Sequence, residues 1–345
     1  METENRVLLI TGAGGHLGKA LLHLLAGSGL PVRGLLYHEE EKKEVEGIDP
    51  DASFFVGDIR EKESLSPFFA NLEGKEAYLI HAASLVDIQH ETLQEPLRLT
   101  NVVGTENVLS LAKEAGVKAS VYVSSVDSFA AKRIVANEES AWVEEKRAGG
   151  YAISKAMANR VVLEYRKKGM DVRIAYPSGF FGPYDEGNNH LNQVVIDFLN
   201  GKIPGVVKQG YAIADARDIA QGVWKVLFEA PQNSSYILSG HYVSLADFVA
   251  EAAKAYGVKK KIRTFPIFLG KVGVPFAKLH GKIHHERPLY TLFSLNLLRD
   301  ANRFDDGKAR KELGYTSRPL EETMKDAVAY FEEKGLLKNK KKAGQ

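Results

Sequence analysis

The chain of 345 residues carries a net charge of +2, is 44% hydrophobic and 26% charged, and contains no cysteine. These values are ordinary for a globular protein that buries a large core in one large or two unequal domains. They exclude disulfides and thiolate chemistry and give no global field that would attract nucleic acid. The start lacks the pattern of a secretion signal, and no apolar run approaches the roughly 20 residues that span a bilayer. We therefore expect a cytoplasmic protein that acts on a small molecule, with no nucleic-acid partner, and membrane association is not favoured.

The first half of the chain alternates short apolar runs with longer segments of helical periodicity. Runs such as VLLI and VYV are unbroken, as expected for strands that are buried on both faces. The alternation predicts an α/β fold in which helices cover both sides of a Rossmann-type, doubly wound parallel sheet. The expected strands are Arg6–Thr11, Val32–Tyr37, Ser53–Val56, Glu76–His81, Ser120–Ser124 and Asp171–Tyr176, and two expected helices are Leu17–Ala26 and Val102–Ala115.

After Pro177 the composition changes to the stretch PSGFFGPYDEGNN, whose glycine, proline and asparagine are typical of a loop. The basic end of the chain, residues 336–345, is expected to be a flexible, solvated tail. Further helices are expected at Leu191–Leu199, Ala216–Phe228, Leu245–Tyr256 and Leu320–Lys334.

The first expected strand runs directly into Gly12, Gly15 and Gly18. A dinucleotide site needs a tight turn here, a close approach of backbone to the pyrophosphate, and close contact between helix and strand. Glycine meets each demand, and the N–H groups that start the next helix attract the anion. The spacing G-x-x-G-x-x-G differs from the usual G-x-G-x-x-G. Its place at the head of a βα series nevertheless favours dinucleotide binding over an ordinary glycine-rich turn.

The residues after the second expected strand bear on the choice between NAD and NADP. An acid at that point binds the ribose hydroxyls of NAD. Here the strand ends in Tyr37 and His38, and no carboxylate precedes Glu39. The missing acid favours NADP over NAD, with Arg33, His38 and Lys42 as candidates for holding the 2′-phosphate. The alternative is that these three are ordinary surface residues.

The pattern Tyr-x-x-x-Lys occurs three times, at Tyr151–Lys155, Tyr256–Lys260 and Tyr330–Lys334. The second copy is expected in a solvated basic patch at a helix end, and the third on the surface of the last helix. The first opens a helix between two expected strands, and residues four apart share one helix face. If that face meets the carboxyl ends of the strands, both side chains lie where such sheets bind ligands.

A phenol and an ammonium so placed suit hydride transfer to a carbonyl, which leaves an alkoxide that must be protonated. The pKa of free tyrosine, roughly 10, is high for this work, and we expect the ammonium of Lys155 to lower the pKa of Tyr151. A nearby hydroxyl must hold the carbonyl oxygen. Ser125 is the preferred candidate and Ser124 the alternative, although both could simply cap the end of the preceding strand.

Together these motifs resemble the extended short-chain dehydrogenase/reductase family, which includes the NAD-dependent epimerases and dehydratases. The later segments at 211–229, 239–257 and 303–328 look most like its dihydroflavonol 4-reductase and 3β-hydroxysteroid dehydrogenase branch. The matching pieces, in family order over roughly residues 5–335, are TGAGGHLG, Gly57-Asp58-Ile59, HAAS at 81–84, NVVGTENVL at 101–109, YVSS at 122–125, YAISK and PSGFFGP.

The resemblance implies a role for each matching residue. Ser125, Tyr151 and Lys155 would form a catalytic triad, and Asn101 would tie the central helix to the sheet. Taken alone, Asp58 would be a turn acid, His81 a core histidine and Asn101 a helix cap. The whole expected cofactor-binding set is Gly12, Gly15, His16, Leu17, Gly18, Tyr37, His38, Asp58, Ile59, Ala82, Ala83, Ser84, Tyr151, Lys155, Pro177 and Gly179.

The resemblance also implies a smaller, discontinuous C-terminal domain for the substrate. Residues 1–177 with about 206–232 would form the dinucleotide-binding domain, and about 178–205 with 233–335 the substrate domain. Asn188, Asn189 and His190 would rim the pocket or, as we favour, shape the start of a helix. The apolar segment 265–283 would roof a pocket for a hydrophobic substrate, lie on a membrane surface, or pack on its own domain.

The leading hypothesis is an NAD(P)-dependent oxidoreductase that interconverts a carbonyl and a secondary alcohol of a small, apolar substrate. An alternative is a nucleotide-sugar epimerase or dehydratase that uses the same trio. Apart from Arg217, residues 178–217 hold no obvious cluster for a nucleotide diphosphate, which weighs against it. A further alternative is a regulator that senses NAD(P) without catalysis, against which the complete triad argues. The family often forms dimers, so a homodimer is also expected.

Overall fold

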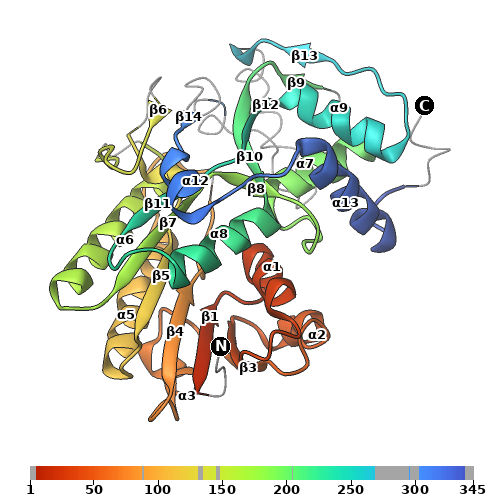
Figure 1. Ribbon diagram of the computed structural model, residues 1–345. Coiled ribbons are helices and arrows are strands. Elements are labelled where there is room, and N and C mark those ends of the chain that lie inside the picture. Colours follow the sequence, from red (N-terminus) through yellow and green to blue (C-terminus); the bar gives the residue numbers. More distant parts are fainter. Residues whose placement is uncertain are drawn as a thin grey trace.

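The structure is a computed structural model that describes residues 5–338 apart from 88, 131–134, 145–147, 204, 269–294 and 296–302. Figure 1 shows a lower part built on a large sheet with helices on both sides, and an upper part that holds several of the later elements. Within the described ranges, no helix has both the length and the apolar character needed to cross a membrane.

Seven parallel strands form the lower part in the order β11-β7-β5-β4-β1-β2-β3. The chain builds outward from β1 to β3 and then continues from β4 on the other side of β1. The carboxyl ends of β1 and β4 therefore flank the crevice where such sheets bind ligands. The strands are β1 (Arg6–Thr11), β2 (Val32–Leu36), β3 (Ser53–Val56), β4 (Glu76–His81), β5 (Ala119–Val123), β7 (Val172–Pro177) and β11 (Ser235–Leu238). The predicted fold is confirmed, and the six predicted strands agree with these bounds to within one residue at each end.

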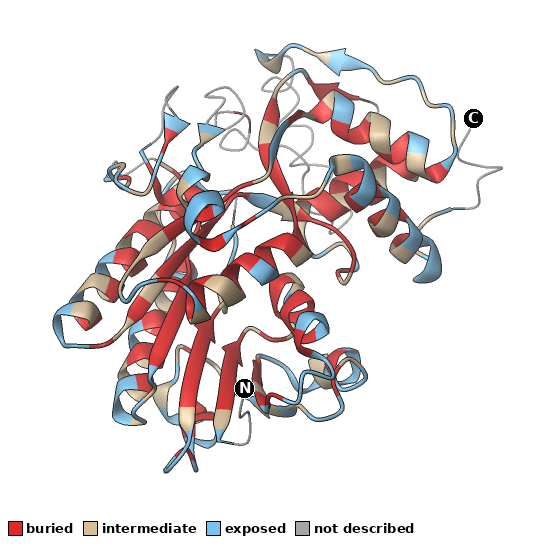
Figure 2. Cartoon of the chain, viewed as in Figure 1, coloured by how far each residue is buried: buried red, intermediate tan, exposed pale blue. Residues whose placement is uncertain are grey.

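Both faces of the sheet are covered, which explains the unbroken apolar runs. Alternate residues of β1 enter two different core clusters, Leu8 and Ile10 one of them and Val7 and Leu9 the other. The buried strands stand out in Figure 2. The first cluster includes residues of α1 (His16–Leu25) and α8 (Ala216–Phe228), and the second includes residues of α5 (Gly104–Glu114) and α6 (Gly150–Lys167).

A smaller sheet and three helices form most of the upper part. Strand β10 (Gly210–Asp215) lies between β8 (Gly179–Phe181), to which it is parallel, and β12 (His241–Ser244), to which it is antiparallel. A third core cluster holds α7, α9 and α13 together. These helices span His190–Leu199, Leu245–Tyr256 and Leu320–Glu333, and their predicted bounds agree to within one residue.

Shorter elements connect these layers. Within the described ranges they are η1 (Glu39–Glu41), α2 (Lys42–Val45), η2 (Lys62–Leu65), α3 (Ser66–Phe69), α4 (Glu95–Leu97), the π-helix η3 (Arg98–Val103), η4 (Val126–Ser128), β6 (Val135–Ala136) paired with β14 (Arg303–Phe304), β9 (Val206–Val207) paired with β13 (Thr264–Phe265), and α12 (Gly307–Leu313).

Two strands lie in a different part of the molecule from the one that the expected domain boundaries assign to them. Strand β11, expected in the substrate domain, pairs with β7 at the edge of the large sheet. Helix α12 packs beside it, where Leu313 accepts a hydrogen bond of 2.7 Å from Lys225 of α8. Strand β10, expected in the dinucleotide-binding domain, instead centres the small sheet. Such short strands are placed by distant partners rather than by local composition. The predictions for 269–283 and for 339–345 fall outside the described residues.

Candidate active site

Two glycines shape the turn that follows β1. Gly12 has a φ of 72°, and a Cβ there would lie 2.8 Å from the backbone of Ala83. A Cβ on Gly18 would overlap the carbonyl oxygen of Gly12, so the first turn of α1 rests directly on the loop. Gly15 precedes α1, whose first turn has no side-chain cap and no acid. The turn fits a pyrophosphate, because backbone N–H groups at a helix start bind anions.

The side chains of His16 and Leu17 face protein. His16 Nε2 lies 2.9 Å from the carbonyl oxygen of Pro183, and the amide of Asn189 lies 3.2 Å from its Nδ1. Burial lowers the pKa of His16, in keeping with a neutral ring between a carbonyl and an amide. Leu17 is buried in the core below α1. His16 and Leu17, both predicted to bind the cofactor, can therefore contact a phosphate only through their backbone N–H groups.

The loop after β4 is tied to the end of β1. The N–H groups of Ala82 and Ala83 donate to the carbonyl oxygen and the hydroxyl of Thr11, at 3.3 and 3.2 Å. His81 lies between the hydroxyls of Thr11 and Thr105, at 2.7 and 3.1 Å. Burial, assisted by the charge of a nearby lysine, lowers the pKa of His81 to about 3. His81 is thus a buried core histidine with a hydrogen-bond partner at each ring nitrogen, as expected for this residue without the family resemblance.

Asn101 links this loop to helix α6. Its side chain accepts from the N–H of Leu85 at 2.8 Å and donates to the hydroxyl of Ser154 in α6 at 2.8 Å. Ser84 donates to the same amide oxygen at 3.1 Å. Asn101 therefore joins the β4 loop to α6, which is a more specific role than a helix cap.

Near the ends of β2 and β3, Arg60 binds two of the residues predicted to contact the cofactor, Asp58 and Tyr37. Arg60 donates to both carboxylate oxygens of Asp58 and, at 2.7 Å, to the hydroxyl of Tyr37. These hydrogen bonds hold the pKa of Asp58 below its usual value. Ile59 is buried against Gly104 of α5. Sequence reasoning missed Arg60, although a cation two residues after the predicted acid was a usable signal.

The cations expected to hold a 2′-phosphate have other partners. Arg33 donates to the carbonyl oxygens of Phe68, Ala70 and Asn71. Lys42 forms an ion pair with Glu39 at 2.6 Å. His38, the third of these residues, is exposed.

Ser125, Tyr151 and Lys155 are brought together and buried, with exposed fractions of 8, 8 and 2%. Ser125 follows β5, whereas the other two lie in the first turns of α6. Lys155 donates to the carbonyl oxygen of Val123 at 2.9 Å, and its Nζ lies 5.9 Å from the centre of the Tyr151 ring. Burial lowers the pKa of Lys155 to about 7.

The pKa of Tyr151 is raised, which is opposite to the expected lowering. Burial is the main cause and the negative charge of Asp127 the second, while hydrogen bonding with Ser125 acts in the other direction. The Nζ of Lys155 donates to a backbone carbonyl, and Lys155 is not among the groups that shift the pKa of Tyr151. The phenol is therefore neutral near pH 7 and carries the proton that a reduction needs.

The choice between the two serines follows from their contacts. Ser124 donates to the amide oxygen of Asn159 inside the core at 2.7 Å. Ser125 instead accepts from the N–H of Asp127 at 3.2 Å and is close enough to the Tyr151 phenol to lower its pKa. Of the two serines, Ser125 is thus the one whose hydroxyl lies near the phenol.

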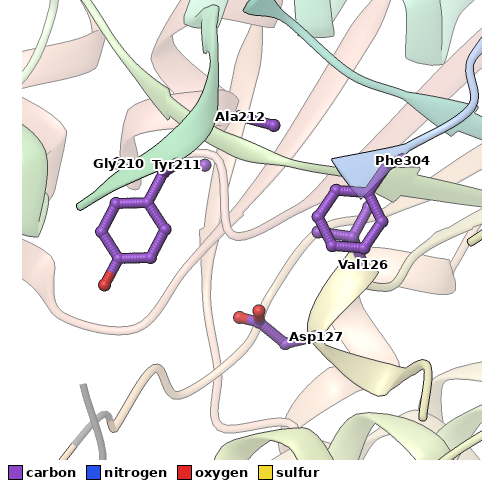
Figure 3. Close-up of a pocket in the computed structure, with 7 residues that line it drawn as sticks. Val126, Asp127, Gly210, Tyr211, Ala212 and Phe304 are labelled. Atoms are coloured by element: carbon purple, nitrogen blue, oxygen red, sulfur yellow. The ribbon is translucent and has the colours of Figure 1, made fainter. Parts of the chain in front are cut away.

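A cavity separates this corner from the small sheet (Figure 3). Gly179, one of the predicted cofactor residues, lies on its wall, whereas Pro177 is buried at the end of β7. Asn189 caps α7 by accepting from the N–H of Leu191, so it shapes a helix start as favoured. The cavity is lined by Val126, Asp127, Gly179, Gly210, Tyr211, Ala212 and Phe304. Sequence reasoning missed Asp127, and its place two residues after Ser125 was the available signal.

The other Tyr-x-x-x-Lys pairs lie elsewhere. Tyr256 is buried and donates to the carbonyl oxygen of Lys338, and Lys260 binds backbone carbonyls at the end of α7. The prediction of a solvated basic patch was wrong for Tyr256 and Lys260, whereas Lys259 and Lys261 are exposed. Lys334 lies 3.6 Å from the carboxylate of Glu186 at the surface, as expected for the third pair.

Comparison with known proteins identifies the family. The NAD dependent epimerase/dehydratase family model matches residues 8–238. The chain is 27% identical over 333 residues to sterol demethylase protein B of Methylococcus capsulatus, an alignment that covers 95% of this chain and 99% of that protein. It is 26% identical over 326 residues to the 4-hydroxy-2-methyl-3-oxo-4-farnesyl-3,4-dihydroquinoline-1-oxide ketoreductase of Stigmatella aurantiaca, with coverages of 92 and 94%. The crystal structure of gox2253 matches with a TM-score of 0.78 and 28% identity, over 97% of this chain and 100% of that chain.

The relatives also include a dihydroflavonol reductase-like protein and a 3-beta-hydroxysteroid dehydrogenase, in agreement with the resemblance of the later segments. The matched region begins within β1 and ends with β11, so it contains the glycine turn and the buried Ser-Tyr-Lys corner. The protein is an oxidoreductase that belongs to the NAD-dependent epimerase/dehydratase family, within the extended short-chain dehydrogenases/reductases.

Proposed function

We propose that this enzyme interconverts a carbonyl group and a secondary alcohol of a small, largely apolar substrate. Ser125 orients the reacting oxygen, Tyr151 exchanges a proton with it, and Lys155 stabilises the phenolate that forms. The bound nicotinamide cofactor supplies or accepts the hydride. The observation that carries the proposal is the convergence of these three buried side chains at the carboxyl end of β5, next to Val126 and Asp127, which line a cavity.

The protonation states support the reductive direction. A neutral Tyr151 has a proton to donate to the oxygen as hydride arrives at the carbon. Lys155, with a pKa of about 7, is charged in roughly half of the molecules at neutral pH. A positive charge near the phenol favours the phenolate once the proton has left.

The relatives and the cavity wall support a carbonyl substrate with an apolar body. The name of the Stigmatella aurantiaca relative describes a ketoreductase that acts on a farnesylated oxo compound. The cavity of the present chain is walled in part by Val126, Phe304 and the ring of Tyr211. Apolar side chains of this kind bind an apolar body by removing it from water.

The NADP preference expected from the sequence is the weaker choice for this proposal. Arg33 and Lys42, two of the three cations proposed for the 2′-phosphate, are engaged with backbone carbonyls and with Glu39. The proposal therefore requires a nicotinamide dinucleotide, and NAD fits the neighbourhood of β2 better.

Nucleotide-sugar epimerisation is the alternative within the family. Its substrate carries a diphosphate that a cation normally neutralises. Arg217, the candidate for that task, pairs with Asp215 and Asp326, each at 2.7 Å. These ion pairs favour the reductase over the epimerase.

The test is the balance of cofactor during turnover. The absorbance of reduced nicotinamide should fall with at least one member of a panel of apolar ketones and aldehydes, with one cofactor oxidised for each alcohol formed. Conversion of a sugar nucleotide without net cofactor consumption would replace the reductase by the epimerase. Cofactor binding with no turnover of any carbonyl or sugar nucleotide would instead indicate a regulator.

A further inference from the structure

We propose that Asp127 binds a substrate hydroxyl one or two carbons away from the reacting carbon, so that the substrate is a hydroxy ketone. This inference rests on the proposed function. It adds one polar anchor to an otherwise apolar pocket and so narrows the substrate class.

Asp127 is positioned by the turn that follows β5. It lies in η4, and its N–H donates to the hydroxyl of Ser125 at 3.2 Å. Its carboxyl group points into the cavity between the rings of Tyr211 and Phe304 (Figure 3). Asp127 keeps part of its surface exposed there. A ligand in the cavity can therefore reach the carboxyl group.

The carboxyl group needs hydrogen-bond donors that the protein supplies only in part. Surrounding protein raises the pKa of Asp127 to about 6, and hydrogen bonding with Ser125 acts in the other direction. In the described part of the chain, no ion pair involves this carboxylate. A carboxylate held in a confined site without a cation gains strongly from a donor on the ligand.

The spacing to the reacting centre sets where that donor must lie. The hydroxyl of Ser125 accepts a hydrogen bond of 3.2 Å from the N–H of Asp127, so the hydroxyl and the carboxyl group lie on one short turn. An oxygen held by Ser125 is therefore separated from the carboxyl group by a short gap. A hydroxyl on the adjacent carbon, or on the next carbon, spans this gap.

The test compares matched ketones by calorimetry. 2-Hydroxyacetophenone and 3-hydroxypropiophenone are titrated against acetophenone and propiophenone, with the protein saturated by oxidised cofactor, which has no hydride to give a ketone. We expect the hydroxylated member of at least one pair to bind about 10- to 100-fold more tightly, because its hydroxyl donates to a charged acceptor. Asp127→Ala should bring that ratio to about one, and Asp127→Asn should leave an intermediate ratio.

A matched control separates this anchor from a general change of the pocket. Phe304→Leu alters the apolar wall, so it should weaken the hydroxylated and plain ketones alike and leave their ratio unchanged. A wild-type protein with no preference for hydroxylated ketones, or a preference that survives Asp127→Ala, would overturn the inference. Either result leaves the reductase proposal intact, since that proposal stands on cofactor oxidation and not on this ratio.

A second inference concerns the cofactor and rests on separate contacts. We infer that Glu41 takes the place of the missing acid after β2 and selects NAD over NADP. Its Oε2 accepts a hydrogen bond of 3.1 Å from the N–H of Tyr37, the first residue after that strand. A Cβ on Gly14 would overlap the same oxygen, so the carboxylate lies directly on the glycine turn.

Such a position fits the adenosine ribose of a bound dinucleotide. An acid beside the glycine turn accepts hydrogen bonds from the ribose hydroxyls of NAD, whereas a 2′-phosphate would meet a like charge there. Sequence reasoning looked for the acid at the strand end itself. The chain instead folds η1 back, so that a residue further along supplies the carboxylate.

Direct binding measurements test this inference. Dissociation constants for NAD⁺ and NADP⁺ are measured by calorimetry with wild-type protein, Glu41→Gln and Glu40→Gln, the last being an exposed acid of the same turn. We expect the wild-type protein to prefer NAD⁺ by about 100-fold, Glu41→Gln to reduce the preference to below about 10-fold, and Glu40→Gln to keep it. Tighter NADP⁺ binding by the wild-type protein, or an unchanged preference in Glu41→Gln, would overturn it. Failure to bind either dinucleotide would count against the proposed function as well.

Discussion

Two regions of this protein carry the same Tyr-x-x-x-Lys pattern and use it differently. Tyr151 and Lys155 lie at the start of α6. Tyr256 is the last residue of α9, and Lys260 lies after that helix. Both phenols are buried, with exposed fractions of 8 and 2%. In both pairs the ammonium donates to backbone carbonyl oxygens. Burial and spacing therefore do not separate a catalytic pair from a structural one.

The difference lies in what surrounds each phenol. The hydroxyl of Tyr256 donates a hydrogen bond to the carbonyl oxygen of Lys338. This contact holds the segment that follows α13 against α9. Tyr151 lies near Ser125 and has Asp127, which lines a cavity, within electrostatic range. A phenol becomes an acid catalyst only where a substrate oxygen can reach it. The comparison thus predicts opposite responses to the same substitutions.

The largest difference is expected from removing each phenol hydroxyl. Tyr151→Phe should lower kcat/KM for a ketone by about 10²–10⁴-fold, because the alkoxide then lacks its proton donor. Tyr256→Phe should leave kcat/KM within about twofold and cost about 1 kcal/mol of unfolding free energy through one lost hydrogen bond. Steady-state kinetics and urea unfolding of both variants check this. Comparable kinetic losses in the two variants would remove the distinction between the pairs.

A smaller effect should separate the two serines that end β5. Ser125→Ala should lower kcat by about 10²-fold, since the hydroxyl stabilises charge that develops on the reacting oxygen. Ser124→Ala should lower it by less than tenfold and instead destabilise the fold, because the amide oxygen of Asn159 loses its donor. Cofactor affinity, measured in parallel, should stay unchanged in both. A larger kinetic loss in Ser124→Ala would move the catalytic role to that residue.

The parts that could be predicted from the sequence are those whose physics is local. The six predicted strands were found because an apolar run buried on both faces is a property of consecutive residues, as in β1. The turn at Gly12 was recognisable because its positive φ demands glycine wherever the loop packs. Ser125, Tyr151 and Lys155 could be placed together because Ser125 follows a predicted strand and the other two open a predicted helix.

The parts that were missed depend on contacts between distant segments. Strand β11 has only four residues, and its partner β7 lies some sixty residues earlier. The partners of Arg33 and Lys260 are backbone carbonyls, which leave no trace in the sequence. The raised pKa of Tyr151 also followed from packing, because burial and the charge of Asp127 raise it.

Burial of Lys155 should make the stability of the protein depend on pH. The pKa of this lysine is about 7 in the fold and 10.5 in the unfolded chain, so the unfolded chain binds more protons between these values. The free energy of unfolding should therefore rise with pH from about 7 to 10, with a slope of at most about 1.4 kcal/mol per pH unit. Lys155→Met should remove this rise. Urea unfolding of both proteins at several pH values checks it, and parallel curves would contradict it.

The smallest effect is expected from replacing Lys260, the lysine of the Tyr256–Lys260 pair. Lys260 donates to the carbonyl oxygens of Phe198 and Leu199, at 2.9 and 2.7 Å, and so caps the C-terminal end of α7. A cation there also meets the negative end of the helix dipole. Lys260→Met keeps the apolar stem but loses both hydrogen bonds, so it should lower the unfolding free energy by about 1 kcal/mol. The exposed neighbour Lys259 provides the control, and Lys259→Met should change neither stability nor turnover. If Lys260→Met instead reduced turnover as strongly as Lys155→Met, the two lysines would share a role that their surroundings do not support.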